Sequence, residues 1–448
     1  MCGACLDREK RKHRISRDVA HREVTRGQSE HTNRALFLPS SLWPDRQISP
    51  GPPHRWKPCL HLFIHFDKGL PHRTSYIIGY TLYTSTSVSG PEPPLETNMA
   101  EFIIPTIDIA PYLADPSSRA SDQIVQEVKE ACITSGFFQV VNHGIDKQLQ
   151  DRVFEASKAF FALPLDEKKA LKHPALRNRG YEQIGGQALD EKQVAPDQKE
   201  GFYVGQHIPP TDERAKKHPE LMGNNIFPKS IPEDKMKEPQ TGTTGMKPSA
   251  NDAPRSSRPT VEAYFYKLRD LSAPILEILS RGLTGRPDAF TSFMSDDPVC
   301  ALRLLHYPAQ ESGKEKLGAG AHSDFGAITL LLQGQEKGLE VKHGDQWILV
   351  EPNPDSYVVN IGDMMEMWTT GTYKSTVHRV INNSGTERYS APFFVDGRAD
   401  EVLTPFDVSK ATPKNRHPET GEWWKAGQYL VSRLTATYAQ AENKTDQS

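Results

Sequence analysis

The 448-residue chain has few cysteines, no excess of either charge and no long hydrophobic run. Five cysteines in a chain of this length do not suggest a disulfide framework. Lysine and arginine number 54 against 57 acidic residues, which argues against nucleic-acid or membrane binding through bulk charge. No stretch of about 18 uncharged apolar residues predicts a transmembrane helix, and the Arg- and Lys-rich start lacks the apolar run of a signal peptide. We therefore expect a cytoplasmic protein without a nucleic-acid or membrane partner.

Two segments differ in composition from the rest of the chain. Hydrophobic residues make up only 36% of the total, so part of the chain is expected not to pack into a core. Residues 1–98 mix scattered Arg and His with Pro-rich stretches, which predicts a disordered or non-native extension that ends before Met99. Residues 231–258 are rich in Pro, Lys, Glu and Ser and predict a disordered insertion. Cys2 and Cys5 could bind a metal, but no second pair accompanies them.

Between these segments, the hydrophobic pattern predicts helices first and strands later. Apolar residues at helical spacing follow Ser121, which we expect to cap a helix, and a long helix is predicted from about Val261 to Leu283. From Ala301 onward, apolar residues fall in short runs separated by Gly, Pro, Asn and Asp. Such runs are typical of an all-β barrel or jelly roll. The expected order is an N-terminal region at 99–230, a supporting helix at 259–297, a β core at 298–406, and a C-terminal helix and tail at 407–448.

A histidine and an aspartate two residues apart form the most informative motif. In an extended strand, residues i and i+2 face the same side, so His322 and Asp324 would offer an imidazole and a carboxylate to one point. His378 is the natural third ligand, because the intervening chain is long enough for several strands to run out and return. Two neutral nitrogens and one hard oxygen suit non-haem Fe(II) and leave positions open for a co-substrate and O₂.

Arg388 and Ser390 share one face of a later predicted strand. A guanidinium offers a planar fork to a carboxylate, and a hydroxyl can add one more hydrogen bond. The pair is suited to hold the distal carboxylate of a dicarboxylic acid whose other end chelates the metal. Arg388 could instead pair with a structural carboxylate such as Glu387 or Asp396.

In this order and spacing, the motifs resemble those of the 2-oxoglutarate- and Fe(II)-dependent dioxygenases, in the branch shared with isopenicillin N synthase. The likeness covers roughly residues 104–406 apart from the insertion. The stretches around His306 and His322 are most similar to fungal oxygenases that tailor secondary metabolites, such as the methyl hydroxylase of the citrinin pathway.

The resemblance implies a fold that is mainly β with flanking helices: a double-stranded β-helix, or jelly-roll, core with an N-terminal α/β region. It implies Fe(II), 2-oxoglutarate as co-substrate and O₂. The implied iron ligands are His322, Asp324 and His378, and the implied 2-oxoglutarate contacts are Arg388, Ser390 and Tyr307. Many plant members have an Asn where this chain has Leu305, so that contact is not carried over.

The predicted function is oxidation, in particular hydroxylation, of a C–H bond of a small organic molecule in secondary-metabolite biosynthesis. Oxidative cyclisation, desaturation or ring expansion at the same site remains open, as does a reaction without 2-oxoglutarate. A non-catalytic, metal-bearing binding module is the alternative of another class. No catalytic residue beyond the metal ligands is predicted, and Phe394, Tyr181 and Phe202 are the aromatic side chains expected to contact the substrate.

Overall fold

The computed structural model describes residues 103–172, 178–193, 195–231, 260–296, 298–310 and 317–445, which all belong to one unit, Pro94–Ser448. The predicted extension 1–98, with Cys2 and Cys5, lies outside the described residues. So does almost all of the predicted insertion at 231–258. Both therefore stay predictions.

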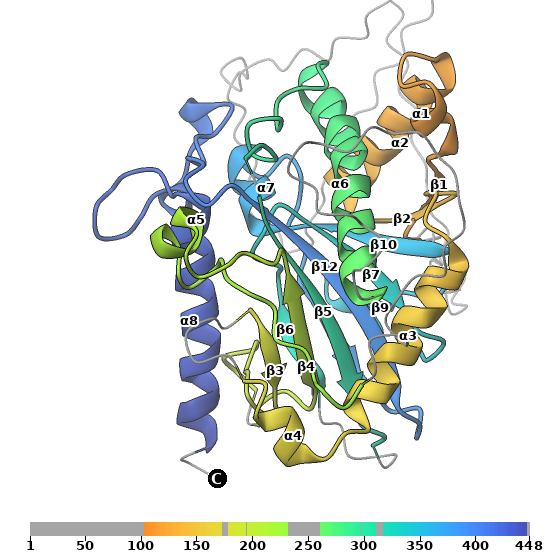
Figure 1. Ribbon diagram of the computed structural model, residues 1–448. Coiled ribbons are helices and arrows are strands. Elements are labelled where there is room, and N and C mark those ends of the chain that lie inside the picture. Colours follow the sequence, from red (N-terminus) through yellow and green to blue (C-terminus); the bar gives the residue numbers. More distant parts are fainter. Residues whose placement is uncertain are drawn as a thin grey trace, which may run out of the picture. The chain divides into compact units, whose positions relative to one another are not determined.

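Helices and strands alternate in the first half of the described chain, and strands dominate the second half (Figure 1). The helices are α1 (Ala110–Ala114), α2 (Arg119–Thr134), α3 (Lys147–Phe161), α4 (Leu165–Lys169), α5 (Glu213–Lys217), α6 (Thr260–Thr284), α7 (Asp363–Trp368) and α8 (Ala426–Thr445). The strands are β1 (Thr106–Asp108), β2 (Phe137–Val141), β3 (Gly180–Glu182), β4 (Glu200–Gly205), β5 (Val299–Tyr307), β6 (Leu317–His322), β7 (Ile328–Gln333), β8 (Leu339–His343), β9 (Gln346–Leu349), β10 (Ser356–Ile361), β11 (His378–Ile381) and β12 (Arg388–Gly397).

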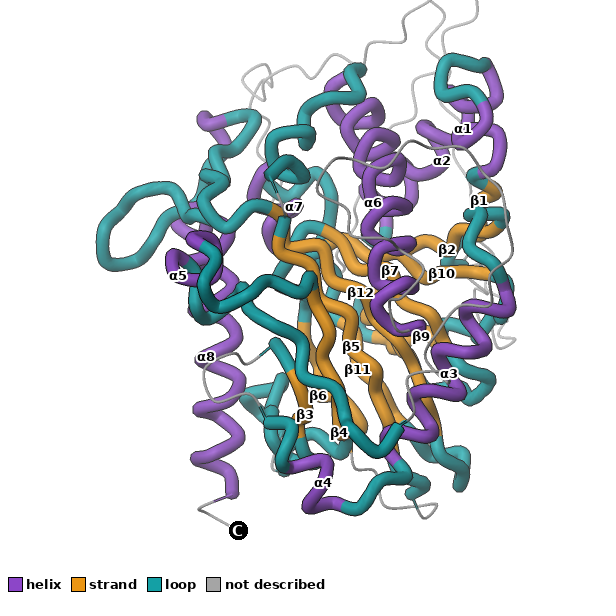
Figure 2. The backbone as a smooth tube through the Cα atoms, viewed as in Figure 1, coloured by secondary structure: helices purple, strands orange, loops and turns teal. Residues whose placement is uncertain are grey.

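The strands form two sheets (Figure 2). The larger sheet has the order β1-β2-β10-β7-β12-β5-β4-β3, and the smaller has the order β6-β11-β8-β9. Only β1 and β2 pair in parallel among these strands; the other pairs are antiparallel. Helices α1, α2, α3 and α6 lie over the outer face of the larger sheet. The fold is the predicted double-stranded β-helix with flanking helices.

Strand alternation divides the apolar residues between two cores. On β10, Tyr357 and Val359 pack outward against the helices, whereas Val358 packs inward between the sheets. On β5, Leu304 likewise faces the helices and Leu305 faces the smaller sheet. Because successive side chains of a strand point to opposite faces, the inward-facing positions of the core strands surround the space between the two sheets.

The start and end of α2 show how local chemistry sets the helix boundaries. The Ser118 side chain, and not that of Ser121, caps α2: it accepts a hydrogen bond of 3.1 Å from the backbone N–H of Ser121. The prediction placed the cap one turn too late. Gly136 follows the helix with φ +71°, and a Cβ there would lie 2.0 Å from the carbonyl oxygen of Lys374. This turn therefore requires glycine.

None of the helices in the described ranges is long and apolar enough to cross a membrane. Helix α8 lies at the edge of the β core and contacts β12 (Figure 1). It brings the C-terminal part of the chain to the strand that carries Arg388 and Ser390.

Candidate metal centre and adjoining cavities

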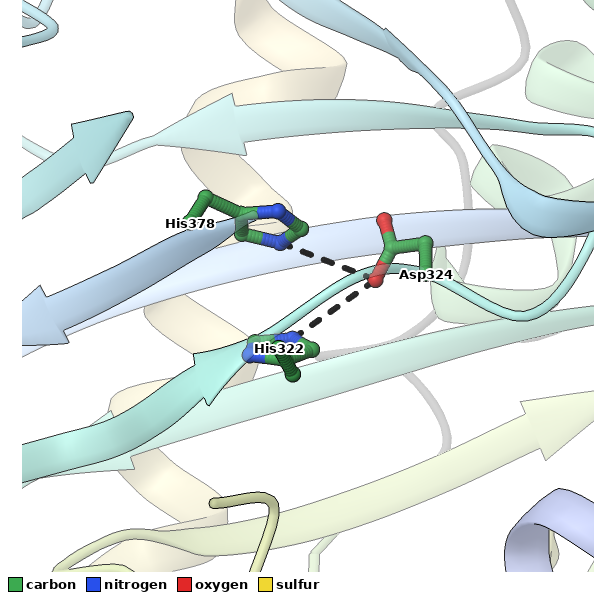
Figure 3. A group of neighbouring side chains, drawn as sticks. All are labelled: His322, Asp324 and His378. Carbon is green, nitrogen blue, oxygen red and sulfur yellow. Dashed lines mark ion pairs between the residues drawn. The ribbon is translucent and has the colours of Figure 1, made fainter. Parts of the chain in front are cut away.

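The three predicted metal ligands converge within the β core (Figure 3). His322 ends β6 and His378 begins β11, and the two residues are direct partners in the antiparallel pairing. Each histidine Nε2 lies 3.7 Å from Oδ1 of Asp324, and the three ligand atoms all lie within 4.8 Å of one another. Asp324 lies in the turn after β6, so a turn and not strand alternation brings its carboxylate to the histidines.

Backbone carbonyls orient both imidazoles. Nδ1 of His322 lies 2.7 Å from the carbonyl oxygen of Gly320, and Nδ1 of His378 lies 3.2 Å from that of Thr376. A proton on each Nδ1 leaves each Nε2 with a lone pair directed at the common point. Burial, and then the charge of His378, lowers the pKa of His322. Burial therefore favours the neutral imidazole, which is the form that binds a metal.

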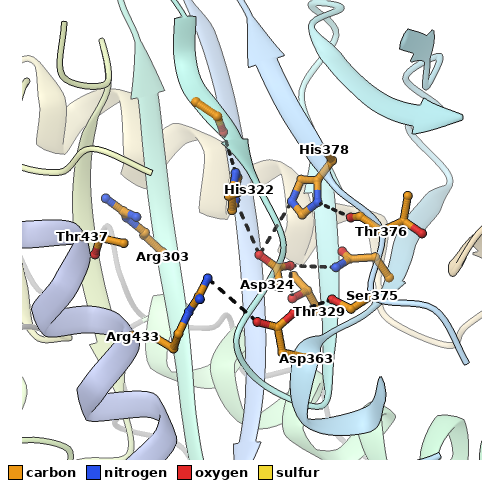
Figure 4. Close-up of polar contacts among 12 residues, drawn as sticks. Arg303, His322, Asp324, Thr329, Asp363, Ser375, Thr376, His378, Arg433 and Thr437 are labelled. Carbon is orange, nitrogen blue, oxygen red and sulfur yellow. Dashed lines mark hydrogen bonds and ion pairs between the residues drawn. The ribbon is translucent and has the colours of Figure 1, made fainter. Parts of the chain in front are cut away.

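The second carboxylate oxygen of Asp324 is held away from the histidines (Figure 4). Oδ2 accepts hydrogen bonds of 2.5 Å from Oγ1 of Thr329 and 2.7 Å from Nδ2 of Asn360. Burial by itself would raise the pKa of Asp324, but the two histidines and these two hydrogen bonds outweigh it and lower the pKa. Sequence reasoning missed Thr329 and Asn360, although each is a polar residue inside an otherwise apolar strand.

The donor set fits Fe(II). Two imidazole nitrogens and one carboxylate oxygen on one face are the ligands that non-haem Fe(II) oxygenases use, and they leave coordination positions free. Within the described part of the chain, His322, Asp324 and His378 are the one group of three His, Cys, Asp or Glu residues found to converge in this way.

A cavity joins the triad to the predicted co-substrate residues. Tyr307, Arg388 and Ser390 all line it, together with His322 and His378. Arg388 and Tyr307 are opposite each other in the pairing of β12 with β5, and the guanidinium carbon lies 4.9 Å from the centre of the tyrosine ring. The structure thus brings all three predicted co-substrate residues to the cavity that contains the metal ligands.

Arg388 is buried with one donor unpaired. Its side chain is 1% exposed; Nη2 donates to Oε1 of Gln333 and Nε donates to the carbonyl oxygen of Glu336, both at 3.2 Å. Nη1 has no hydrogen-bond partner among the described residues. Neither Glu387 nor Asp396 pairs with Arg388 there. A buried, unpaired guanidinium N–H in a cavity fits a carboxylate ligand.

A second cavity also borders His322 and Asp324. Phe394, one of the predicted substrate contacts, lines both cavities. The second cavity is lined by Asn178, Gln187, Leu189, Tyr203, Ala301, Arg303, His322, Asp324, Phe325, Gly326, Phe394, Asp396, Leu430 and Leu434. Leu430 and Leu434 belong to α8, so this helix closes one side of the cavity.

Tyr181 and Phe202, the other two predicted substrate contacts, line neither of these two cavities. They are partners in the pairing of β3 with β4, and both pack on the outer face of the sheet. The Tyr181 hydroxyl donates to Oε2 of Glu200 at 2.7 Å, and the ring of Phe202 lies 4.2 Å from that of Phe160. The prediction treated them as wall residues because they are aromatic, but their strand register points them toward α3.

Arg303, which sequence reasoning did not select, lines both cavities. Its Nη2 pairs with Oε1 of Glu182 at 2.5 Å, and its Nη1 donates to Oε1 of Gln187 at 3.0 Å. The guanidinium also lies 4.4 Å from the ring centre of Tyr203. Its charge is therefore already compensated by protein groups.

A double-stranded β-helix with a His, Asp and His triad beside a buried arginine defines a class of proteins: non-haem iron oxygenases that use 2-oxoglutarate. Residues 298–397 match the 2OG-Fe(II) oxygenase superfamily, and residues 104–230 match the family described as non-haem dioxygenase in morphine synthesis N-terminal. The chain belongs to the 2OG-Fe(II) oxygenase superfamily. It is an enzyme of the class that uses Fe(II), 2-oxoglutarate and O₂.

Fungal enzymes are among the similar proteins. The 2-oxoglutarate-dependent dioxygenase citB of Monascus ruber is 40% identical over 353 residues, which is 77% of this chain and 98% of that protein. Clavatol oxidase claD of Penicillium crustosum is 36% identical, over 75% of this chain and 97% of its own. The structure of a full-length Neurospora crassa protein in complex with alpha-KG and thymine matches with a TM-score of 0.59 and 27% identity, over 76% of this chain and 99% of that protein.

Proposed function

We propose that the enzyme hydroxylates a C–H bond of a small organic molecule in fungal secondary metabolism. In this proposal, His322, Asp324 and His378 hold Fe(II). Arg388, Ser390 and Tyr307 bind 2-oxoglutarate in the cavity that these ligands share. When bound, Fe(II) supplies the activation of O₂ that couples decarboxylation of 2-oxoglutarate to oxidation of the substrate.

The observation that carries the proposal is an unpaired donor in the same cavity as three converging ligand atoms. Nη1 of Arg388 is buried without a partner among the described residues, while Oδ1 of Asp324 and the two Nε2 atoms face one point. A dicarboxylic acid can satisfy both at once, with its distal carboxylate on Arg388 and its other end on the metal. Ser390 and Tyr307 add hydroxyl groups to the cavity wall.

The second cavity gives the substrate a separate place. It shares His322 and Asp324 with the first cavity but is lined by α8 and by Phe325. A substrate there can reach His322 and Asp324 without contacting Arg388, which lines only the first of these two cavities. Apolar side chains such as Leu430 and Leu434 exclude water and orient a small molecule.

The names of similar proteins support a small-molecule substrate. One relative is named a clavatol oxidase, and the Neurospora crassa protein was solved with thymine. A small-molecule substrate and a cytoplasmic location, as the cysteine usage predicts, are parts of the same proposal.

The division of roles is tested by two substitutions. His322→Ala should abolish iron binding and turnover together, because one of three protein ligands is lost. Arg388→Lys should keep iron but raise the KM for 2-oxoglutarate by about tenfold or more, because a point charge replaces a fork. Iron content of the reconstituted protein and calorimetric binding of 2-oxoglutarate in the presence of Mn(II) measure the two effects separately.

Matched controls are available on neighbouring strands. His343→Ala removes a histidine at the exposed end of β8, and Arg379→Lys changes an arginine that pairs with Glu340 at 2.7 Å. Both variants should retain iron and 2-oxoglutarate affinity. An equal loss of iron in His322→Ala and Arg388→Lys would contradict the assignment. Turnover without stoichiometric succinate would remove 2-oxoglutarate from the reaction.

A further inference from the structure

Asp396 is a carboxylate in the second cavity with no protein partner. It lies near the end of β12, is 5% exposed, and lines the cavity together with His322 and Phe394. Within the described ranges, no hydrogen bond or ion pair reaches this carboxylate. Gly326 leaves space for it, because a Cβ at that position would lie 2.3 Å from Oδ1 of Asp396. The fold therefore leaves room for a buried carboxylate but provides no hydrogen-bond donor or cation for it among the described residues.

Burying a carboxylate without a partner destabilises the folded protein. Burial, and then the charge of Asp324, raises the pKa of Asp396 to about 7. Groups of this kind are concentrated at functional sites, where a ligand completes their hydrogen bonding. The free-energy cost of burying Asp396 without a partner is explained if a bound molecule supplies the missing hydrogen-bond donor.

The nearby cations do not supply it. Arg303 pairs with Glu182, and Arg433 on α8 lies 3.9 Å from Oδ2 of Asp363 (Figure 4). A second acceptor in the same wall is also unpaired, because Oδ1 of Asn178 is buried without a partner among the described residues. Among the described residues of this wall, Asp396 and Asn178 thus present acceptors without donors, and Nε of Arg303 is one buried donor without an acceptor.

We propose that Asp396 accepts a hydrogen bond from the substrate, which therefore carries an O–H or N–H group on a small, uncharged and largely apolar skeleton. This inference rests on the proposed function and adds the chemical class of its substrate. Asp396 lines the same cavity as His322 and Asp324, so a hydrogen bond at Asp396 would fix which C–H bond faces the metal ligands.

The other side chains that line the second cavity indicate which charge the substrate carries. Leu189, Phe325, Leu430 and Leu434 are apolar. An acidic substrate would be repelled by the Asp396 carboxylate. An uncharged donor, such as a phenol or an imide, meets both requirements.

The test uses probes that differ only in the donor. The full chain is loaded with Mn(II) and 2-oxoglutarate, so that binding near the metal is detected by paramagnetic relaxation of the methyl protons of the probe, without turnover. The pairs are 4-methylphenol with 4-methylanisole, and thymine with 1,3-dimethylthymine. At a pH well above 7, where the Asp396 carboxylate is ionised, wild-type protein should bind the donor member of at least one pair about tenfold or more tightly, as expected for a hydrogen bond to a charged group. 4-Methylbenzoate should bind weakly.

Asp396→Leu replaces the carboxylate with an apolar group of the same shape. It should abolish the preference for the donor member while leaving Mn(II) and 2-oxoglutarate affinity unchanged. Its Tm should be equal to or higher than that of the wild type, because an unpaired buried carboxylate has been removed. Asp345→Asn, at an exposed turn, is the control and should change none of these quantities.

Each result that departs from these expectations contradicts either the inference about Asp396 or the proposed function. Equal binding of both members of every pair by the wild type, including no binding of either, overturns the inference. A preference that survives in Asp396→Leu, or a lowered Tm that points to a structural role, also overturns it. Failure of the wild type to bind Mn(II) and 2-oxoglutarate refutes the proposed function instead.

Discussion

Asn360 on β10 donates a hydrogen bond of 2.7 Å to Oδ2 of Asp324, which lies in the turn after β6. Together with Thr329, which donates to the same oxygen, it leaves Oδ1 directed at the two histidines. The larger sheet thus orients a carboxylate that the loop at the end of the smaller sheet carries.

Removing this hydrogen bond should weaken metal binding without removing a ligand. Asn360→Ala leaves Oδ2 of Asp324 with one donor, so the carboxylate is free to rotate. We expect the affinity for Mn(II) to fall by about tenfold or more, the effect typical of groups that orient metal ligands. Titration calorimetry measures it. Thr329→Val should act in the same direction and Asn353→Ala, in a turn outside the site, should have no effect. Unchanged affinity in both site variants would contradict this role.

Patterns that depend only on local sequence predicted much of the fold. The long helix expected from Val261 to Leu283 is α6, Thr260–Thr284, and the short apolar runs after Ala301 are strands of the two sheets. The metal triad could be predicted because two of its members are separated by a single residue and the third begins a recognisable strand.

The walls of the cavities could not be predicted in the same way. Arg303 and Asp396 come from strands whose inward faces become known only when the pairing of β4 with β5 and of β5 with β12 is known. Tyr181 and Phe202 were selected by aromatic character alone, and register turned them outward. A charged residue inside an apolar strand, as at Arg303, is the signal that could have found the missing wall residues.

Gly136 and Gly144 have similar positive φ angles, but only Gly136 lies close to another backbone segment. Alanine substitutions at these two positions therefore distinguish backbone strain from steric overlap. Gly136 has φ +71° and a Cβ there would lie 2.0 Å from the Lys374 carbonyl oxygen, whereas Gly144 has φ +76° and no atom within 4 Å of a Cβ. Gly144→Ala should cost about 1 kcal/mol of unfolding free energy, from backbone strain alone. Gly136→Ala should cost roughly 1–3 kcal/mol more, from overlap with backbone that cannot easily move. Urea denaturation of both variants measures the difference, and equal costs would contradict the close approach.

Helix α8 is tied to the metal-site loop through Asp363. The hydroxyl of Tyr429 donates to Oδ2 of Asp363 at 2.7 Å, and the backbone N–H of Asp363 donates to the carbonyl oxygen of Asp324 at 2.8 Å. Tyr429→Phe removes the first of these bonds. We expect amide exchange in α8 to accelerate by about tenfold, which corresponds to the roughly 1–2 kcal/mol of a hydrogen bond to a carboxylate.

Hydrogen-exchange mass spectrometry of α8 peptides measures this effect. Ser432→Ala, on the exposed side of the same helix, serves as the control for a general change in helix stability. Exchange that accelerates equally in both variants would mean that the contact with Asp363 does not hold the helix.

Glu200 on β4 joins three side chains in a buried cluster outside the site. It accepts hydrogen bonds from Lys168 at 2.8 Å and Tyr181 at 2.7 Å, and lies 2.8 Å from Nδ1 of His306. Burial by itself would raise the pKa of Glu200, but these three contacts outweigh it and lower the pKa below the ordinary value of 4.5. A carboxylate with a lowered pKa stabilises the fold fully above the unfolded-state pKa, and that stabilisation is lost as the pH falls through the folded-state pKa.

Glu200→Gln should therefore destabilise the protein most at neutral pH. We expect a loss of roughly 3 kcal/mol, because Lys168 is left as a buried charge without its partner. The difference from the wild type should narrow as the pH falls below about 4.3, where the unfolded-state carboxylate takes up its proton while the folded-state carboxylate is still ionised. Glu351→Gln removes the acid of an exposed pair with Lys337, also at 2.8 Å, and should change stability by less than about 1 kcal/mol at any pH. Denaturant unfolding between pH 3 and pH 8 compares the two variants, and a pH-independent difference for Glu200→Gln would show that packing, and not charge, connects this cluster to the fold.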